Sequence, residues 1–152
     1  MVWGAFSSKA KSELCILNSR LNAERYCNVL EEYLLPFAYA EHGHQRDDFI
    51  FMHDGATCHI ANITRDYLNQ CDIEVMDWPA VSPDLNPIEN IWGILVQRVY
   101  ENGRQFQTVN QLRSCVMEQW NSLQQFELEP LTDSMTDRCI AVLQKNGVPT
   151  KC

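Results

Sequence analysis

The sequence predicts an α/β domain that contains a parallel pair of strands. Two apolar runs of strand length, Phe49–His53 and Ile73–Trp78, flank an amphipathic segment, Asn62–Gln70. A strand, a helix and a second strand in such a short span form a βαβ unit, in which the two strands run parallel. The chain has 152 residues, of which 45% are apolar, enough for one domain with a core and too few for two ordinary ones. We therefore expect residues 1–152 to form a single domain.

The bulk composition excludes several classes of protein. Twelve Lys and Arg residues against twenty Asp and Glu give a formal net charge of -8, and the basic residues are scattered. A protein that binds nucleic acid by charge alone needs clustered basic residues. The seven cysteines contain no C-x-x-C pair, which favours a reducing setting over a disulfide framework. No signal-peptide pattern or apolar run of membrane length is present, so we expect no membrane association.

The N-terminal third is expected to form a hairpin followed by a helix. The apolar runs Met1–Phe6 and Leu14–Leu17 lie on either side of a polar turn. Asn22 is the expected N-cap of a helix that ends near Pro36 or soon after, with apolar residues at helical spacing. These are Tyr26, Val29, Leu30, Tyr33, Leu34 and Phe37. The polar segment Glu41–Asp48 is expected to be a loop, with His42 and His44 solvated rather than bound to a metal.

Asp54 is the first candidate site residue. It follows the continuous apolar run Phe49–His53, which is typical of a strand buried on both faces. Ligand sites in parallel sheets lie beyond the carboxyl ends of the strands. A soft metal site built from Cys58, His59, Cys71 and His53 is a less favoured alternative, because zinc ligands usually come in closely spaced pairs.

The stretch SPDLNPIENIW, residues 82–92, begins a helix and carries Glu89. Pro79 and Pro83 predict an extended connection, while Asn86 is a good N-cap and Pro87 suits the first helical position. The buried stripe of this helix is expected to comprise Ile88, Ile91, Trp92, Leu95 and Val99. Glu89 lies off that stripe in the first turn, where the helix dipole favours an acid by about 0.3 to 1 kcal/mol. Its position alone therefore does not assign it a function.

Two further helices and several local roles complete the prediction. Thr108–Leu123 is expected to be helical, with Val109, Leu112, Val116, Trp120 and Leu123 inward. Leu131–Leu143 is expected to form the last helix, with Met135, Cys139 and Val142 inward, ended by Gly147 and Pro149. Asp84 is interpreted as a turn residue rather than a metal ligand. Trp78 and Trp92 are interpreted as core residues.

The predicted order of elements places Asp54 and Glu89 at the same end of the sheet. Thirty-four residues lie between them. Paired carboxylates from two elements suit Mg²⁺ or Mn²⁺, which prefer oxygen ligands. The sequence thus indicates a divalent metal site formed by these two side chains.

Four features together resemble the DDE transposases of the mariner superfamily, particularly the Tc-type branch. They are the stretches MVWGAFS, FMHDGATCH and DWPAVSPDLNPIENIW, and the spacing of 34 residues. The resemblance is strong from Met1 to about Tyr100 and weaker to Lys151. It implies a ribonuclease H-like fold, a mixed five-stranded sheet flanked by helices. It also implies three carboxylates that hold two Mg²⁺ or Mn²⁺ ions, with Asp54 as the second aspartate and Glu89 as the glutamate.

The resemblance implies further properties. The first catalytic aspartate and its central strand have no counterpart here, so we expect a partial catalytic domain, truncated and inactive alone. In such a domain Met1–Phe6 either pairs with Phe49–His53 or leaves an exposed edge there. The implied partner is the DNA of transposon ends, with a possible homodimer and a nuclear location. His59 orients its loop, meets DNA or is purely structural, and Gly55 replaces the asparagine usual in the family.

Two other interpretations remain. One is a non-catalytic transposon remnant or a domesticated protein-interaction module, which the acidic charge and the missing strand favour. The other is a small phosphohydrolase that uses Asp54 and Glu89, for which the sequence offers no nucleophile or phosphate-binding loop.

Overall fold

A computed structural model describes residues 1–43, 49–79 and 82–145. The chain divides into two compact units, each described by itself below. Unit 1 comprises Met1–Gly4 and Cys15–Ser82, and unit 2 comprises Ala5–Leu14 and Pro83–Cys152. The single domain expected over residues 1–152 stays a prediction.

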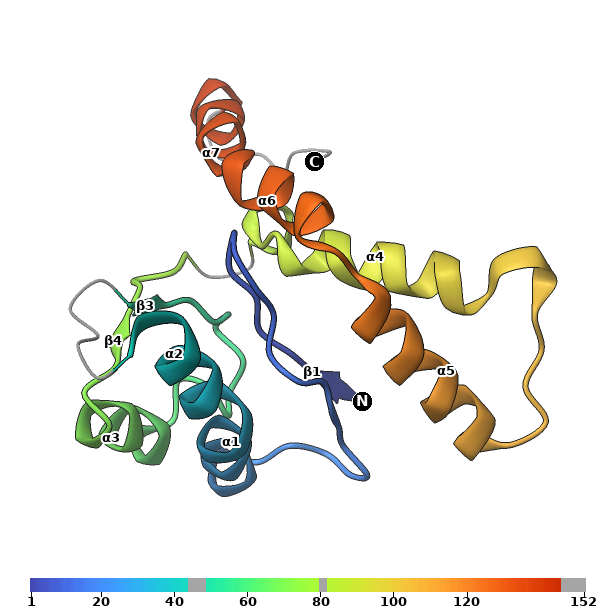
Figure 1. Ribbon diagram of the computed structural model, residues 1–152. Helices are drawn as coiled ribbons and strands as arrows, with labels where there is room; N and C mark the ends of the chain where they lie inside the picture. The colour runs from blue at the N-terminus through green and yellow to red at the C-terminus, as the bar shows by residue number, and fades with distance from the viewer. Residues whose placement is uncertain (44–48, 80–81, 146–152) are drawn as a thin grey trace. The chain divides into compact units, whose positions relative to one another are not determined.

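Unit 1 begins with the predicted hairpin. Strands β1 (Val2–Trp3) and β2 (Cys15–Ile16) pair in antiparallel fashion, with Val2 opposite Ile16 and Trp3 opposite Cys15 (Figure 1). Among the described residues β1 pairs with β2 and not with Phe49–His53, so the first of the two expected alternatives, direct pairing, is wrong.

The first helical segment starts where the sequence predicts. Asn22 Oδ1 accepts a hydrogen bond from the Arg25 backbone N–H at 3.0 Å, and caps α1 (Ala23–Val29). The π-helical segment η1 (Leu30–Leu34) follows without a break, and α2 (Leu35–His42) continues past Pro36. In the wider π turn the Leu35 N–H donates to the Leu30 carbonyl, just before the proline that lacks an N–H. The helix therefore covers the start of the loop predicted over Glu41–Asp48, whereas His44 lies outside the described residues.

The predicted βαβ unit is confirmed in direction and only partly in burial. Strands β3 (Ile50–Phe51) and β4 (Glu74–Val75) are parallel, and α3 spans Asn62–Gln70 between them. Phe51 is 7% exposed but Ile50 is 48% exposed, so the expected burial of this strand on both faces is wrong. Among the described residues β3 and β4 form a sheet of two strands, whose outer face is left open.

Unit 2 is built around the helices α4 and α5. The short 3-10 turn η2 (Pro83–Leu85) leads into α4 (Ile88–Val99), and the turn η3 (Glu101–Gly103) precedes α5 (Val109–Ser122). The Trp92 and Trp120 rings stack between α4 and α5 with centroids 5.5 Å apart. The Trp120 side chain is fully buried, and its Nε1–H donates to the Ser12 carbonyl at 2.9 Å. Trp92 therefore packs on the core residue Trp120 but is itself half-buried, so the core role predicted for it is confirmed only in part.

The buried faces predicted for α4 and α5 are confirmed in part. Ile91, Leu95 and Val99 are buried, as expected. On α5, however, Val109 is 66% exposed, and Cys115 is buried instead. Val109 is the first residue after the Thr108 cap, whereas the buried residues Cys115 and Trp120 lie further along the helix.

The C-terminal helix differs from the prediction. Two helices, α6 (Gln125–Asp133) and α7 (Met135–Gln144), replace the single helix expected over Leu131–Leu143. The Ser134 hydroxyl donates to the Leu131 carbonyl at the break, a local bond that competes with helix continuation. Cys139, which was expected inward, is exposed. Gly147 and Pro149 lie outside the described residues.

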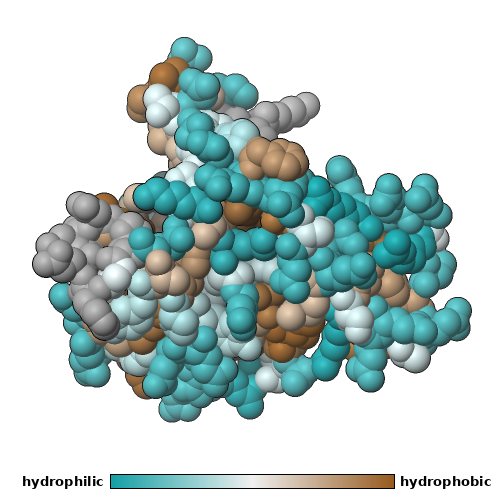
Figure 2. All heavy atoms as spheres, viewed as in Figure 1, coloured by the Kyte–Doolittle hydropathy of each residue, from teal (hydrophilic) through white to brown (hydrophobic). Residues whose placement is uncertain are grey.

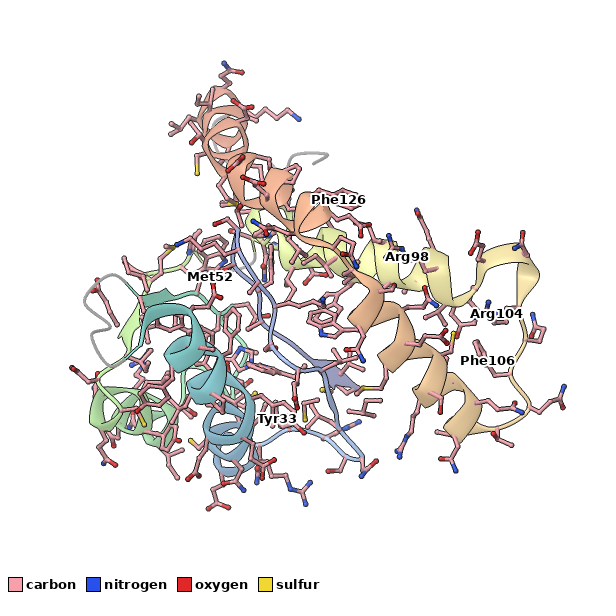
Figure 3. All side chains as sticks on the ribbon, viewed as in Figure 1. Tyr33, Met52, Arg98, Arg104, Phe106 and Phe126 are labelled. Carbon is pink, nitrogen blue, oxygen red and sulfur yellow. The ribbon has the colours of Figure 1, made fainter. Side chains whose placement is uncertain are left out.

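The surface of unit 2 is mixed in character. Arg98 of α4, labelled in Figure 3, forms an ion pair with Glu127 of α6. Figure 2 shows hydrophobic residues on the surface of the last two helices, where Phe126 and Leu143 are 72% and 75% exposed. Within the described ranges, no helix combines the length and the apolar character needed to cross a membrane.

Candidate active site

The carboxylate of Asp54 is held by its own loop just beyond β3. Its Oδ1 atom accepts hydrogen bonds from His59 Nδ1 at 2.6 Å and from the Ala56 backbone N–H at 2.9 Å. The same turn is closed by the His59 N–H, which donates to the Ala56 carbonyl at 2.8 Å. The Asp54 side chain is 55% exposed. The loop thus presents an oriented and accessible carboxylate at the strand end where the sequence places it.

His59 is itself fixed by an aromatic cluster. Its ring lies parallel to that of His53, with an interplanar angle of 4° and centroids 5.1 Å apart. Its other neighbour is Tyr26 of α1, whose ring centroid lies 4.1 Å away. The Tyr26 hydroxyl and His53 Nδ1 are hydrogen-bonded at 3.1 Å. With a side chain only 16% exposed, His59 has little freedom to turn away from Asp54.

The cluster beneath His59 is uncharged near neutral pH. Burial raises the pKa of the Tyr26 hydroxyl, which therefore stays protonated. The pKa of His53 is lowered to about 4, mainly by burial and to a smaller extent by the nearby His59. Both side chains therefore act on His59 by ring packing rather than by charge.

Thr64 ties the Asp54 loop to α3. The Thr64 side chain is fully buried, and its hydroxyl donates to the Cys58 carbonyl at 2.7 Å. This hydrogen bond to a partly buried carbonyl fixes the loop backbone between Asp54 and the helix. The sequence pattern places Thr64 in a short helix and does not single it out.

Glu89 lies in the first turn of α4 and is exposed, off the buried stripe as predicted. The predicted start of this helix is confirmed as well. Asn86 Oδ1 accepts from the Ile88 N–H at 3.3 Å, and Pro87 has helical dihedral angles of φ -67° and ψ -18°. Asp84 falls in the turn η2, which agrees with its interpretation as a turn residue.

Sequence reasoning missed Arg138 near this helix start. Arg138 is 5% exposed, and its guanidinium donates to the Asp84 carbonyl and to Asn90 Oδ1. The predicted stripe had placed its neighbour Cys139 inward instead. A charged residue on a short helix is ordinarily solvated, so no signal in the sequence marked it.

The described residues test only part of the predicted metal site. Asp54 belongs to unit 1 and Glu89 to unit 2, so their convergence on one ion stays a prediction. Within the described part of the chain, no three His, Cys, Asp or Glu side chains come together as a group that could hold a metal ion. The alternative zinc set of Cys58, His59, Cys71 and His53 is therefore not assembled there.

Comparison with known proteins reveals extensive similarity. The profile of the family described as DDE superfamily endonuclease matches residues 1–113. The transposable element Tc3 transposase of Caenorhabditis elegans is 45% identical over 149 residues, which cover 98% of this chain and 44% of the relative. The Tc1 transposase of the same organism is 32% identical and is matched over 99% of this chain and 54% of the relative. The chain thus spans about half the length of these relatives.

Solved structures show the same fold. The Mos1 transposase catalytic domain with raltegravir and Mg matches with a TM-score of 0.86 at 19% identity, covering 99% of this chain and 76% of that one. A Mos1 paired-end complex with the left transposon end matches with a TM-score of 0.75 at 22% identity, covering 93% of this chain and 41% of that one. These likenesses confirm the predicted ribonuclease H-like mixed α/β fold.

Proposed function

Because the chain belongs to the DDE superfamily endonuclease family, we propose that Asp54 and Glu89 are two of the carboxylates of a divalent-metal site that cuts and joins DNA during transposition. The observation that carries the proposal is the Asp54 carboxylate, exposed beyond β3 and oriented by two hydrogen bonds. Glu89 is the exposed acid at the start of α4, inside the stretch DWPAVSPDLNPIENIW, which lies within the residues that the family profile matches.

The donor chemistry of both residues fits a hard cation. Mg²⁺ and Mn²⁺ prefer carboxylate oxygens, and Mos1 structures with each of these metals are known. A carboxylate has about four acceptor positions, and both hydrogen bonds to Asp54 fall on Oδ1. A divalent cation held there would activate water or a DNA 3′-hydroxyl and stabilise the leaving oxygen. Asp54 and Glu89 would supply the ligand oxygens and the negative charge.

His59 would act as a positioning residue for Asp54. Its Nδ1–H holds Oδ1 at 2.6 Å, and Tyr26 and His53 fix its ring. Groups that orient a metal ligand in this way tune metal affinity without touching the ion. This role is favoured over direct DNA contact because the His59 side chain is only 16% exposed.

The proposed substrate is DNA, and the proposed compartment is the nucleus. The Mos1 paired-end complex contains a left transposon end. With a net charge of -8, this chain would rely on bound cations to bring phosphates close to its carboxylates. A homodimer that joins two DNA ends would be compatible with this function.

A non-catalytic protein-interaction module remains the second candidate. It is favoured by the acidic net charge of -8. It predicts that neither Asp54 nor Glu89 affects metal binding.

Calorimetric titration with Mn²⁺ tests the proposal on the 152-residue chain. We expect D54N and E89Q each to weaken binding by more than about tenfold, since each removes an anionic ligand. The controls D66N on α3 and E118Q on α5 remove exposed carboxylates elsewhere and should have no effect. If both residues share one ion, the effects of D54N and E89Q will not add in the double variant.

Two results decide between the candidates. Metal-dependent nicking of supercoiled DNA that E89Q abolishes would support the enzyme. Mn²⁺ binding that neither D54N nor E89Q alters at millimolar concentrations would refute the metal site and leave the interaction module.

A further inference from the structure

Arg138 of α7 is an unusual feature of unit 2 because it is a buried ion. The buried polar or charged residues among those described are Ser12, Thr64, Asn86 and Arg138. Removing a charged group from water is unfavourable unless hydrogen bonds replace the lost hydration. The burial of Arg138 therefore raises the question of what its guanidinium binds.

The guanidinium joins three short segments of unit 2. Nη1 donates to the Asp84 carbonyl at 3.1 Å, and Nη2 donates to Asn90 Oδ1 at 2.7 Å. Nε donates to the Ser134 hydroxyl at 2.8 Å, which keeps the planar group oriented. Asp84 lies before the start of α4 and Asn90 lies in its first turn, so Arg138 bridges the helix start from both sides.

This bridge lies at the start of a helix, where the first four backbone N–H groups lack partners within the helix. The start of α4 is closed instead by tight bonds, in which the Glu89 N–H donates to Asn86 and the Asn90 N–H donates to Pro87. Successive helical residues are separated by a rotation of about 100°. Fixing Asn90 in the first turn of α4 therefore also fixes the direction in which the side chain of the preceding residue, Glu89, points from the helix.

We propose that Arg138 is a positioning residue for Glu89, which it serves by holding the turn η2 and the first turn of α4 against α7. The proposal rests on the proposed function of Glu89 as a metal ligand. It also draws on a residue outside the family profile, which matches residues 1–113. The last helix thus becomes part of the support of the metal site.

Amide hydrogen exchange tests the bridge directly. In R138Q we expect the amides of residues 88–91 to exchange about 10- to 100-fold faster, because the two hydrogen bonds that the charged Arg138 donates to the helix start are lost. N90A removes the Nη2 contact alone and should accelerate exchange at the same amides by a smaller factor. R98Q is the matched control, since Arg98 pairs with Glu127 at the other end of α4 and should leave these amides unchanged.

Mn²⁺ titration tests the consequence for the metal site. R138Q should weaken Mn²⁺ binding by about 10- to 100-fold, as other supports of metal ligands do. It should have no further effect in a chain that already carries E89Q. A role in general stability alone would not produce this dependence on Glu89.

The outcomes separate the two proposals. Unchanged exchange at residues 88–91 in R138Q and N90A would overturn the bridge, as would acceleration spread evenly over unit 2. If E89Q weakens Mn²⁺ binding and R138Q does not, the positioning role is wrong. If E89Q has no effect on Mn²⁺, the proposed function fails, while the exchange data still decide whether Arg138 holds the helix start.

Discussion

The substitution H59F tests how Asp54 is oriented. Phenylalanine keeps a flat ring packed against Tyr26 and His53 but lacks the N–H from which Asp54 Oδ1 accepts a hydrogen bond at 2.6 Å. A hydrogen bond to a charged group is worth about 1.5 to 3 kcal/mol when buried. Asp54 is 55% exposed, so solvent screening reduces the loss of unfolding free energy to about 1 kcal/mol or less.

The expected effect on metal affinity is larger than that on stability. Removing a residue that orients a metal ligand typically costs about 10- to 100-fold in affinity. We therefore expect H59F to raise the Mn²⁺ dissociation constant by about that factor, measured by calorimetry. The unfolding free energy of the same variant, measured by urea unfolding, should fall by about 1 kcal/mol or less.

H53F is the matched control, because we expect it to lower the stability of the protein without changing its affinity for Mn²⁺. It keeps the stacked ring but leaves the buried Tyr26 hydroxyl without the partner that it has at 3.1 Å. An unsatisfied buried group costs about 1 to 3 kcal/mol, so stability should fall. Mn²⁺ affinity should hold, since His53 does not bond to Asp54. If H59F binds Mn²⁺ like the parent while D54N loses binding, the positioning role of His59 is refuted.

Three further predictions concern stability, each checked by urea unfolding. W120F should lower the unfolding free energy by about 2 to 4 kcal/mol, because it leaves a cavity and an unpaired buried carbonyl at Ser12; a loss below about 1 kcal/mol would contradict this. N22A removes the cap of α1 and should lower the unfolding free energy by about 1 kcal/mol; an unchanged urea midpoint would show that the cap does not stabilise the helix. T64V leaves the Cys58 carbonyl without its donor and should cost about 1 to 2 kcal/mol, with faster amide exchange at residues 56–60. Exchange unaltered in that loop would argue against Thr64 as its anchor.

Local sequence chemistry was sufficient for several elements. Asn22 caps α1 as predicted, α3 spans the predicted Asn62–Gln70, and the βαβ order gave the parallel pairing of β3 and β4. A cap, a helical repeat of apolar residues and a crossover connection each depend on residues near one another in the chain. The family motifs around Asp54 and Glu89 are likewise continuous stretches of sequence.

Burial required knowledge of the tertiary contacts. Ile50 lies in an apolar run and was expected to be covered, yet one face of its two-stranded sheet is open. Val109 and Cys139 fit an apolar stripe but are exposed, whereas Arg138 is buried. Periodicity shows which side chains share a helix face, but it does not show how far a neighbouring element extends over that face.

The sequence by itself determined the family, the fold class and the two acidic candidates, because these follow from short motifs and their order. Only the tertiary structure identified the side chains that support those acids. Tyr26 and His53 beneath His59 are 27 residues apart, and Arg138 reaches the Asp84 carbonyl across 54 residues. Such contacts depend on how distant segments fold together, and a hydrogen bond between them leaves no periodic trace in the sequence.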